Sequence, residues 1–245
     1  MGVVGAIQGG IKRLVRRAGV DIVRYPGKDP AHARAKLLRH QGVDVVFDIG
    51  ANCGQYGSEL RSHGYAGGLV SFEPLSEPFG ELCERAGRDG AWEVVRAAVG
   101  EATGETIVNI SGNSLSSSLL PILPAHTDAE PTSAYIGQET TPMVTLDEVY
   151  DRYATGRARP FIKIDAQGYE RQVLAGASTS LACAVGVQME LSLVPLYEGA
   201  MSFEEGLETM RASGLELARL DPVFEDQRTG RLLQCDGVFV RARYA

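Results

Sequence analysis

VDVVFDIGANCG, residues 43–54, is the stretch that decides the fold of this 245-residue chain. Its first half is a nearly continuous apolar run, which is typical of a central parallel strand that is buried on both faces. The run ends at Asp48, and Gly50 and Gly54 follow in a D-x-G-x-x-x-G turn. Glycine lets the backbone turn tightly and approach a ligand closely. We therefore expect a strand–turn–helix unit that holds a small molecule.

The same alternation of strand and helix continues along the chain. The spacing predicts helices over residues 30–40, 55–64, 76–87 and 203–214, a further helix beginning near Tyr169, and strands over residues 68–74, 92–100, 160–165, 183–191, 215–222 and 235–245, with residues 105–111 as an edge strand. Such alternation implies right-handed crossovers and an α/β, doubly wound, mostly parallel sheet. The last two strands are joined by a turn-rich stretch, so we expect them to form an antiparallel pair at one edge.

Composition limits the function classes. Apolar residues make up 44% and charged residues 22% of the chain, as in an ordinary globular protein. The formal charge of -7 argues against nucleic acid as a partner. The cysteines are scattered, which favours reduced thiols and a cytoplasmic location; they are Cys53, Cys83, Cys183 and Cys235. No apolar run is long enough to span a bilayer.

Two segments stand apart from the main α/β domain over residues 41–245. Residues 1–40 are expected to be an N-terminal helical lead, in which a packing helix is favoured over one lying on a membrane surface. Residues 111–142 are rich in Ser, Thr, Pro and Gly and are long for a loop inside a compact domain. The embedded LLPIL and Tyr135 favour a lid-like insertion over a disordered loop.

Ligands bind at the carboxyl ends of strands in an open α/β sheet, so the residues there are informative. Asp48 can accept a hydrogen bond from an ammonium group, and the N–H groups of the following helix can bind a carboxylate. Glu73, about twenty residues beyond the turn, can accept from the two hydroxyls of a ribose. Ala97 and Ala98 leave room for an adenine ring. The plain alternatives are an ordinary turn, a solvated acid and packing alanines.

The strand that ends near Asp165 carries the candidate catalytic groups. Lys163 and Asp165 lie on one face of it, and Asp165 can orient or deprotonate a hydroxyl group. The alternative is that Asp165 only caps the following helix. His126, in the expected lid, is a second candidate to take the proton, although a lone loop histidine is more often solvated. A Mg²⁺ site formed by Asp165, Glu190 and Asp236 is conceivable, but no tight ligand motif supports it, and a metal is not predicted.

Four stretches, FDIGANCGQYG (47–57), SFEP (71–74), VTLDEVY (144–150) and FIKIDAQGYERQVLAGA (161–177), together resemble the FkbM family of methyltransferases. The resemblance covers roughly residues 44–188. It implies a class I, Rossmann-like methyltransferase fold with S-adenosylmethionine as cofactor, and O-methylation, commonly of sugars or natural products. It also places the methionine end of the cofactor at the turn and the ribose at Glu73. One departure is Gln167, where many members of the family carry an acid.

The sequence therefore predicts an O-methyltransferase that acts on a small, sugar-containing acceptor. The expected catalytic residues are Asp165, His126 and Lys163; the cofactor residues Asp48, Gly50, Ala51, Asn52, Gly54, Tyr56, Glu73, Pro74, Ala97, Ala98 and Ser117; and the substrate residues Gln167, Glu190, Tyr197 and Tyr135. An NAD(P)-dependent oxidoreductase is the main alternative, disfavoured because the turn lacks G-x-G-x-x-G. A non-catalytic adenosylmethionine-binding protein is another. A homodimer is left open.

Overall fold

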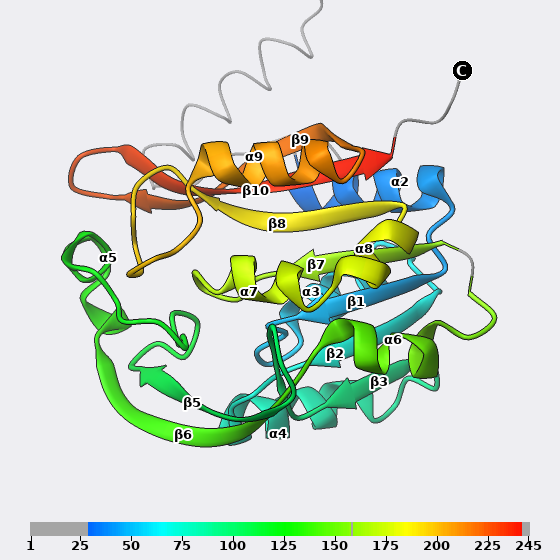
Figure 1. The fold of residues 1–245 in the computed structure, drawn as a ribbon, viewed down its shortest axis with the longest axis horizontal. Coiled ribbons are helices and arrows are strands. Elements are labelled where there is room, and N and C mark those ends of the chain that lie inside the picture. Colours follow the sequence, from blue (N-terminus) through cyan, green and yellow to red (C-terminus); the bar gives the residue numbers. More distant parts are fainter. Residues whose placement is uncertain (1–28, 158, 242–245) are drawn as a thin grey trace, which may run out of the picture.

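The computed structural model describes residues 29–157 and 159–241 (Figure 1). The expected N-terminal lead lies outside these residues up to position 28. The helices are α2 (Pro30–Gln41), α3 (Gln55–Ser62), α4 (Ser76–Ala86), α5 (Pro124–Ala129), α6 (Leu146–Ala154), α7 (Glu170–Ala175), α8 (Ser178–Cys183) and α9 (Phe203–Ala212), with a 3-10 turn η1 (Pro131–Ser133). The strands are β1 (Val45–Ile49), β2 (Gly68–Phe72), β3 (Trp92–Val95), β4 (Ala98–Val99), β5 (Gly104–Ser111), β6 (Tyr135–Val144), β7 (Pro160–Ile164), β8 (Gly186–Ser192), β9 (Leu215–Asp226) and β10 (Arg231–Arg241).

The main sheet has seven strands in the order β3-β2-β1-β7-β8-β10-β9. Neighbouring strands are parallel from β3 to β8, and β10 runs antiparallel to both β8 and β9. This confirms the expected doubly wound, mostly parallel sheet with an antiparallel last strand, the Rossmann-like fold of a class I methyltransferase. The order in which strands are added to the sheet reverses between β1 and β7. The carboxyl ends of these two strands therefore lie side by side at the switch point, where such sheets bind ligands.

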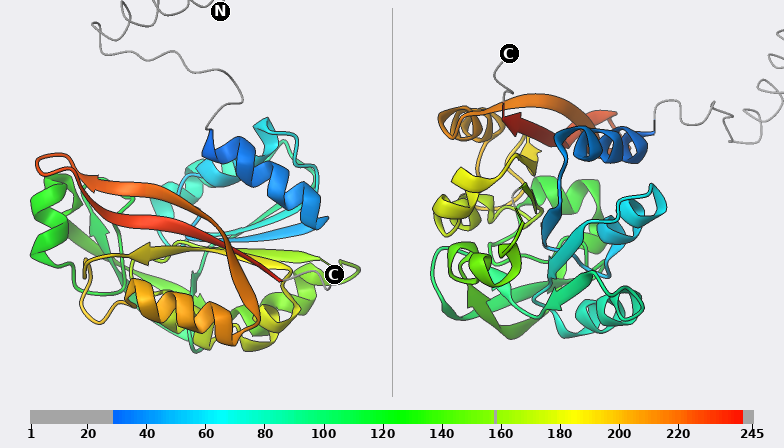
Figure 2. Two further views of the ribbon diagram at one scale, coloured as in Figure 1. Left: turned by 90° about the horizontal axis from the view of Figure 1, so that it is seen from above. Right: turned by 90° about the vertical axis from the view of Figure 1, so that its right-hand side faces the viewer.

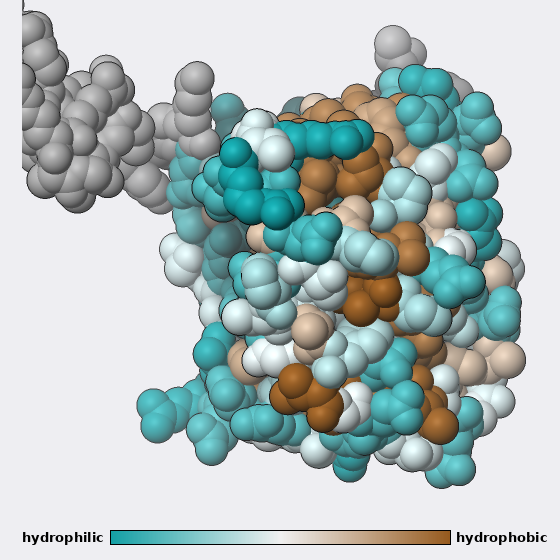
Figure 3. All heavy atoms as spheres, turned by 90° about the vertical axis from the view of Figure 1, so that its left-hand side faces the viewer, coloured by the Kyte–Doolittle hydropathy of each residue, from teal (hydrophilic) through white to brown (hydrophobic). Residues whose placement is uncertain are grey.

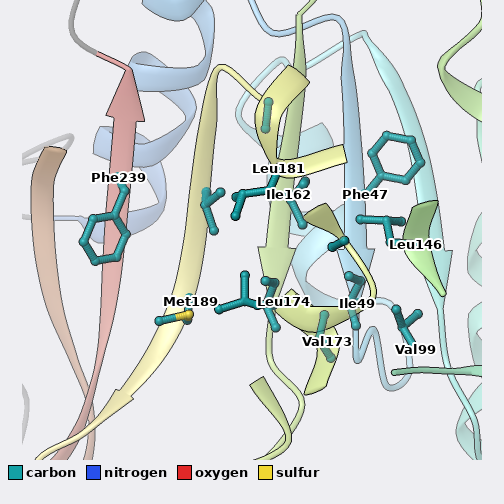
Figure 4. Close-up of a cluster of buried hydrophobic side chains, with 14 of the residues drawn as sticks. Phe47, Ile49, Val99, Leu146, Ile162, Val173, Leu174, Leu181, Met189 and Phe239 are labelled. Carbon is teal, nitrogen blue, oxygen red and sulfur yellow. The ribbon is translucent and has the colours of Figure 1, made fainter. Parts of the chain in front are cut away.

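Helices cover both faces of this sheet, as the two views of Figure 2 show. One face packs against α6, α7, α8 and α9, and Phe47, Ile49 and Ile162 lie in its core (Figure 4). The other face packs against α2, α3 and α4 through Leu38 and Leu82, among other residues. All five residues of β1 are buried, because side chains on both faces of the strand point into one of these two cores.

A second, three-stranded sheet in the order β4-β6-β5 lies below the main sheet in Figure 1. Residues 105–111 form an edge strand, as expected, but of this second sheet, where β5 pairs with β6. One expectation is wrong here. The third strand of the main sheet stops at Val95, where the amide of Ala97 donates to the Val95 carbonyl at 3.1 Å. The chain then turns, and Ala98 and Val99 pair in parallel with β6.

Residues 111–142, the expected lid-like insertion, contain more regular structure than a loop. The segment begins at the end of β5, includes α5 and η1, and returns along β6. Tyr135 Oη donates to the Leu120 carbonyl at 2.6 Å, and the Leu123 amide donates to the Leu196 carbonyl at 2.9 Å. The first bond lies within the segment, and the second attaches the segment to the loop after β8, at the side of the molecule toward which the arrow of β7 points in Figure 1.

None of the helices within residues 29–157 and 159–241 is long and apolar enough to cross a membrane. Figure 3 views the molecule from the side at which the parallel strands end; apolar patches are set among hydrophilic residues there. Leu115, 58% exposed, belongs to the loop that follows β5.

Candidate functional site

The turn after β1 approaches β7 so closely that only glycine fits. Gly50 has a φ of 73°, and a Cβ atom there would lie 1.8 Å from the carbonyl oxygen of Asp165. Asn52 also has a positive φ, 47°, a region that asparagine tolerates better than most residues. Its amide side chain donates to Ser114 Oγ at 3.3 Å and thereby links the turn to residues 111–117. The turn is therefore a rigid cradle at the switch point.

Asp48 does not occupy the place that the sequence suggested. Its side chain is fully buried, and Lys163 Nζ lies 3.1 Å from Oδ1, while Ser71 Oγ donates to Oδ2 at 3.1 Å. Lys163 also donates to the Gly50 carbonyl at 2.9 Å. Burial by itself lowers the pKa of Lys163, but the carboxylates of Asp165 and Asp48 outweigh it and raise the pKa overall. Asp48 thus holds a cation beneath the turn instead of facing a ligand.

Glu73 stands at the end of β2 and is almost fully buried. Its Oε2 accepts from the Asn52 amide at 2.8 Å and its Oε1 from the Leu75 amide at 2.9 Å. Burial raises the pKa of Glu73 to about 7, against the stabilising effect of these two amides. The carboxylate is therefore fixed in orientation and sensitive to pH near neutrality.

A first hollow of about 650 Å³, partly open to solvent, lies between the turn and the second sheet. Its lining combines two carboxylates, Glu73 and Asp165, with small and apolar residues. Of the expected residues, Gly50, Asn52, Glu73, Pro74, Ala97, Ala98, Ser117, Asp165 and Gln167 line it. The convergence of residues from three strand ends and from the loop after β5 gives a cavity suited to a nucleoside.

A second hollow, of about 740 Å³, opens on the other side of the turn and is lined by more charged side chains than the first. It shares Gly50, Asn52, Leu115 and Asp165 with the first hollow. Ala51, Tyr56 and Lys163 of the expected residues line it, together with Arg34, Gln55, Glu59, Gln188 and Asp236. Gln188 Nε2 donates to Asp236 Oδ2 at 2.9 Å, and Gln188 Oε1 accepts from Tyr56 Oη at 3.2 Å, so the wall is a connected polar network.

Asp165 borders both hollows, with its side chain 33% exposed. Lys163 Nζ lies 3.3 Å from Oδ2, and Gln167 Nε2 donates to Oδ1 at 2.7 Å. The same Gln167 nitrogen donates to Glu190 Oε2 at 2.9 Å. Burial, and next the charge of Asp165, raises the pKa of Glu190 well above its usual value. Gln167, with a φ of 51°, therefore bridges two carboxyl groups where the family often carries an acid.

Three of the expected residues that line neither hollow are aromatic. The ring of His126 is buried against Tyr197 and Phe224, at centroid distances of 5.2 and 5.0 Å, and burial lowers the pKa of His126 to about 4. Tyr197 is fully buried, and its hydroxyl donates to Gln167 Oε1 at 2.8 Å. The Tyr135 hydroxyl donates a hydrogen bond to the Leu120 carbonyl. These aromatic residues stabilise the loop behind Gln167, so the structure does not support a proton-accepting His126 or acceptor-binding tyrosines.

Gly54 lines neither hollow, because a Cβ atom there would meet Leu82 and Trp92 in the core behind the turn. Its role is to let α3 begin close to the sheet. Glu190 lies behind Gln167 rather than at the wall. In the part of the chain that the structure describes, no group of three or more His, Cys, Asp and Glu side chains is placed to hold a metal ion. Asp165, Glu190 and Asp236 thus form no such group.

Arg34 and Gln188 line the second hollow but are not among the residues expected from the sequence. A signal for each was present. Arg34 stands among Ala31, Ala35 and Leu38 on the buried face of α2, where the helical spacing otherwise selects apolar residues. Gln188 is a lone amide within a buried strand. A polar residue at a core position needs a partner, which is a reason to suspect a site.

The chain is similar in structure to magnesium protoporphyrin IX methyltransferase from Synechocystis PCC 6803, solved with bound SAM (13% identity, TM-score 0.47, covering 95% of this chain and 91% of that one). It is also similar to 1,6-didemethyltoxoflavin-N1-methyltransferase from Burkholderia thailandensis (14% identity, TM-score 0.44, covering 88% and 80%). A search of curated proteins gives no match. The model of the methyltransferase FkbM domain matches residues 48–217, and the chain therefore belongs to the FkbM family of methyltransferases.

Proposed function

We propose that this protein transfers a methyl group from S-adenosylmethionine to a hydroxyl group of a small acceptor that carries several hydroxyls, such as a sugar or a glycosylated molecule. The observation that carries the proposal is the placement of Asp165, a partly exposed carboxylate that borders the first hollow. Lys163 contacts one of its oxygens and Gln167 donates to the other. Membership in a methyltransferase family argues against the oxidoreductase alternative.

The residues of the first hollow fit the adenosine half of the cofactor. Glu73 presents a fixed carboxylate that can accept from vicinal ribose hydroxyls, and Ala97 and Ala98 leave a flat space for the base. Gly50 lets the turn lie against the Asp165 carbonyl, where a Cβ atom would have no room, and so fixes the floor between the two hollows. When bound, S-adenosylmethionine supplies an electrophilic methyl group on a sulfonium.

The chain's own contribution to transfer is alignment and proton acceptance. An acceptor hydroxyl that donates a hydrogen bond to Asp165 is oriented toward the first hollow. With S-adenosylmethionine bound, the hydroxyl oxygen would take the methyl group, the methyl–sulfur bond would break to leave a neutral thioether, and the hydroxyl proton would pass to Asp165. Lys163 and Gln167 act as positioning residues, since each holds one oxygen of this carboxylate.

A polyhydroxylated acceptor suits the polar groups around Asp165. Gln167 offers an amide beside this carboxylate, and Asn52 offers another at the wall of the first hollow. Carboxylates and amides accept and donate to neighbouring hydroxyls in fixed directions, and such groups fix the orientation of a polar ligand. This chemistry supports a sugar-like acceptor over an apolar one.

The test is the variant Asp165→Asn, which keeps the shape of the side chain but removes the base. We expect kcat for methylation of a panel of glycosides and polyols to fall roughly 10²- to 10⁴-fold, the usual contribution of a general base. The affinity for adenosylhomocysteine, measured by calorimetry, should change little. Asp151→Asn is the matched control, because Asp151 is exposed on α6.

Two results would contradict the proposal. Binding of adenosylhomocysteine without turnover on any hydroxylated acceptor would indicate a non-catalytic binding protein. Full activity of Asp165→Asn would remove Asp165 as the base while leaving the family assignment intact.

A further inference from the structure

Arg34 is a buried charge on a helix that otherwise contributes apolar residues to the core. Its side chain is only 9% exposed, and it occupies the same face of α2 as Ala35 and Leu38. Burying a guanidinium is costly unless its donors are matched. The position therefore calls for an explanation beyond packing.

The protein itself satisfies only part of this guanidinium. Nη2 donates to Glu59 Oε1, and Nη1 stands 3.9 Å from Asp236 Oδ2, beyond hydrogen-bond distance. Nε is buried without any partner. The guanidinium carbon lies 5.2 Å from the centre of the Tyr56 ring, which limits its movement. Since arginine has five N–H donors in a fixed fork, most of its capacity remains available to an anion.

The place of Arg34 identifies which anion. It lines the second hollow, which meets the first at Gly50, Asn52 and Asp165. If adenosine lies between Glu73 and the alanines, the rest of the cofactor must pass Gly50 and enter the second hollow. The remaining part of S-adenosylmethionine is an amino acid, with one carboxylate and one ammonium group.

Resting on the proposed use of S-adenosylmethionine, we propose that Arg34 binds the carboxylate of its methionine half. The paired geometry of a guanidinium and a carboxylate suits this role. Asp236, whose Oδ2 lies 3.9 Å from Arg34 Nη1, lines the same hollow and is the acceptor for the adjacent ammonium group. The second hollow is then complementary to a zwitterion, and α2, which precedes β1, completes the cofactor site. Asp236 thus takes the place of Asp48 as the partner of the ammonium group, because Asp48 is buried beneath the turn.

The experiment compares two ligands that differ in the amino-acid part. Adenosylhomocysteine has the carboxylate, whereas 5′-methylthioadenosine has neither the carboxylate nor the ammonium group. Both are titrated by calorimetry into the full chain and into Arg34→Met. We expect Arg34→Met to weaken adenosylhomocysteine roughly 10- to 100-fold, as for one lost charge-assisted hydrogen bond, and to leave methylthioadenosine unchanged.

Matched variants separate charge from position. Lys36→Met removes an exposed cation from the same helix and should change neither affinity. Arg34→Lys keeps a charge but loses the fork, so its affinity for adenosylhomocysteine should be intermediate. Retained binding of methylthioadenosine also shows that each variant has folded.

The outcomes are distinct. Equal weakening of both ligands by Arg34→Met would overturn the inference, because Arg34 would then act on the fold as a whole. Unchanged binding of adenosylhomocysteine with a raised KM for the acceptor would also overturn it and assign the second hollow to the acceptor. If the unaltered chain binds neither ligand, the proposed function fails, and this inference fails with it.

Discussion

Lys163 and Asp48 form an ion pair directly beneath the ligand-binding turn, with 3.1 Å between Nζ and Oδ1. Asp48 is fully buried and the Lys163 side chain is 7% exposed, so neither charge can be solvated if the other is removed. The same ammonium group contacts the Gly50 carbonyl and Asp165 Oδ2. One cation therefore connects the first strand, the turn and the candidate base.

The first prediction concerns this pair. Lys163→Met leaves the Asp48 carboxylate buried with only Ser71 as a side-chain partner, so we expect it to lower the free energy of unfolding by roughly 3–5 kcal/mol. Asp48→Asn should cost less, because Lys163 keeps Asp165 at 3.3 Å. Urea denaturation measures both. The double variant should recover part of the loss caused by Lys163→Met, and simple addition of the two losses would contradict the coupling.

The second prediction concerns the pH dependence of cofactor binding. Burial raises the pKa of Glu73 from 4.5 to about 7. The folded protein therefore binds a proton at Glu73 more tightly than the unfolded chain does. Protonated Glu73 stabilises the folded protein at low pH, and this stabilisation is lost as the pH rises through about 7. Binding has the opposite sign, because only the carboxylate accepts from both ribose hydroxyls. We expect the affinity for adenosylhomocysteine to fall about tenfold from pH 8 to pH 6, as ionisation of one group requires.

Two variants test which carboxyl group causes this pH dependence of binding. Glu73→Gln should bind weakly and show a flat profile in the same calorimetric titration. Burial also raises the pKa of Glu170 to about 7, but its carboxylate accepts from the Gly168 amide at 3.0 Å and does not line the first hollow. Glu170→Gln should therefore keep the profile of the unaltered chain. A profile that disappears with Glu170 instead would contradict the role given to Glu73.

The third prediction separates close packing from backbone conformation at the turn. Gly50 and Gly64 both have positive φ values, 73° and 82°. A Cβ atom at Gly64 would meet nothing within 4 Å, whereas one at Gly50 would collide with the Asp165 carbonyl oxygen. Gly64→Ala should cost only about 1–2 kcal/mol in thermal or urea unfolding. Gly50→Ala should cost more and should also abolish binding of adenosylhomocysteine; equal costs would contradict the close approach.

The fourth prediction concerns His126. Burial lowers the pKa of His126 from 6.5 to about 4, so the unfolded chain binds a proton there that the folded protein rejects. Stability from this neutral histidine is present above pH 6.5 and is lost as the pH falls toward 4. His126→Phe should lose less stability between pH 7.5 and pH 5 than the unaltered chain, as measured by urea unfolding. Its kcat should be unchanged at pH 7.5, and a large fall would restore the catalytic role.

Much of the fold could be predicted from the sequence because its signals are local. The apolar run before Asp48 indicates a buried strand wherever it occurs, and the glycines at 50 and 54 mark a turn by their backbone freedom alone. Glu73 could be predicted as the acceptor for the ribose hydroxyls, because the length of a β-α-β unit fixes its distance from that turn. The second sheet was not predicted, since the pairing of β5 with β6 joins residues across a 23-residue connection.

The sequence by itself thus determined the strands of the main sheet, the glycine turn, Glu73 and the acid at position 165. Only the tertiary structure decided which polar groups line the two hollows. It brings Arg34, Gln188 and Asp236 from distant elements to one hollow and buries Asp48 beneath the turn. Local backbone preferences are written in neighbouring residues, whereas the direction and burial of a side chain depend on contacts between segments far apart in the chain.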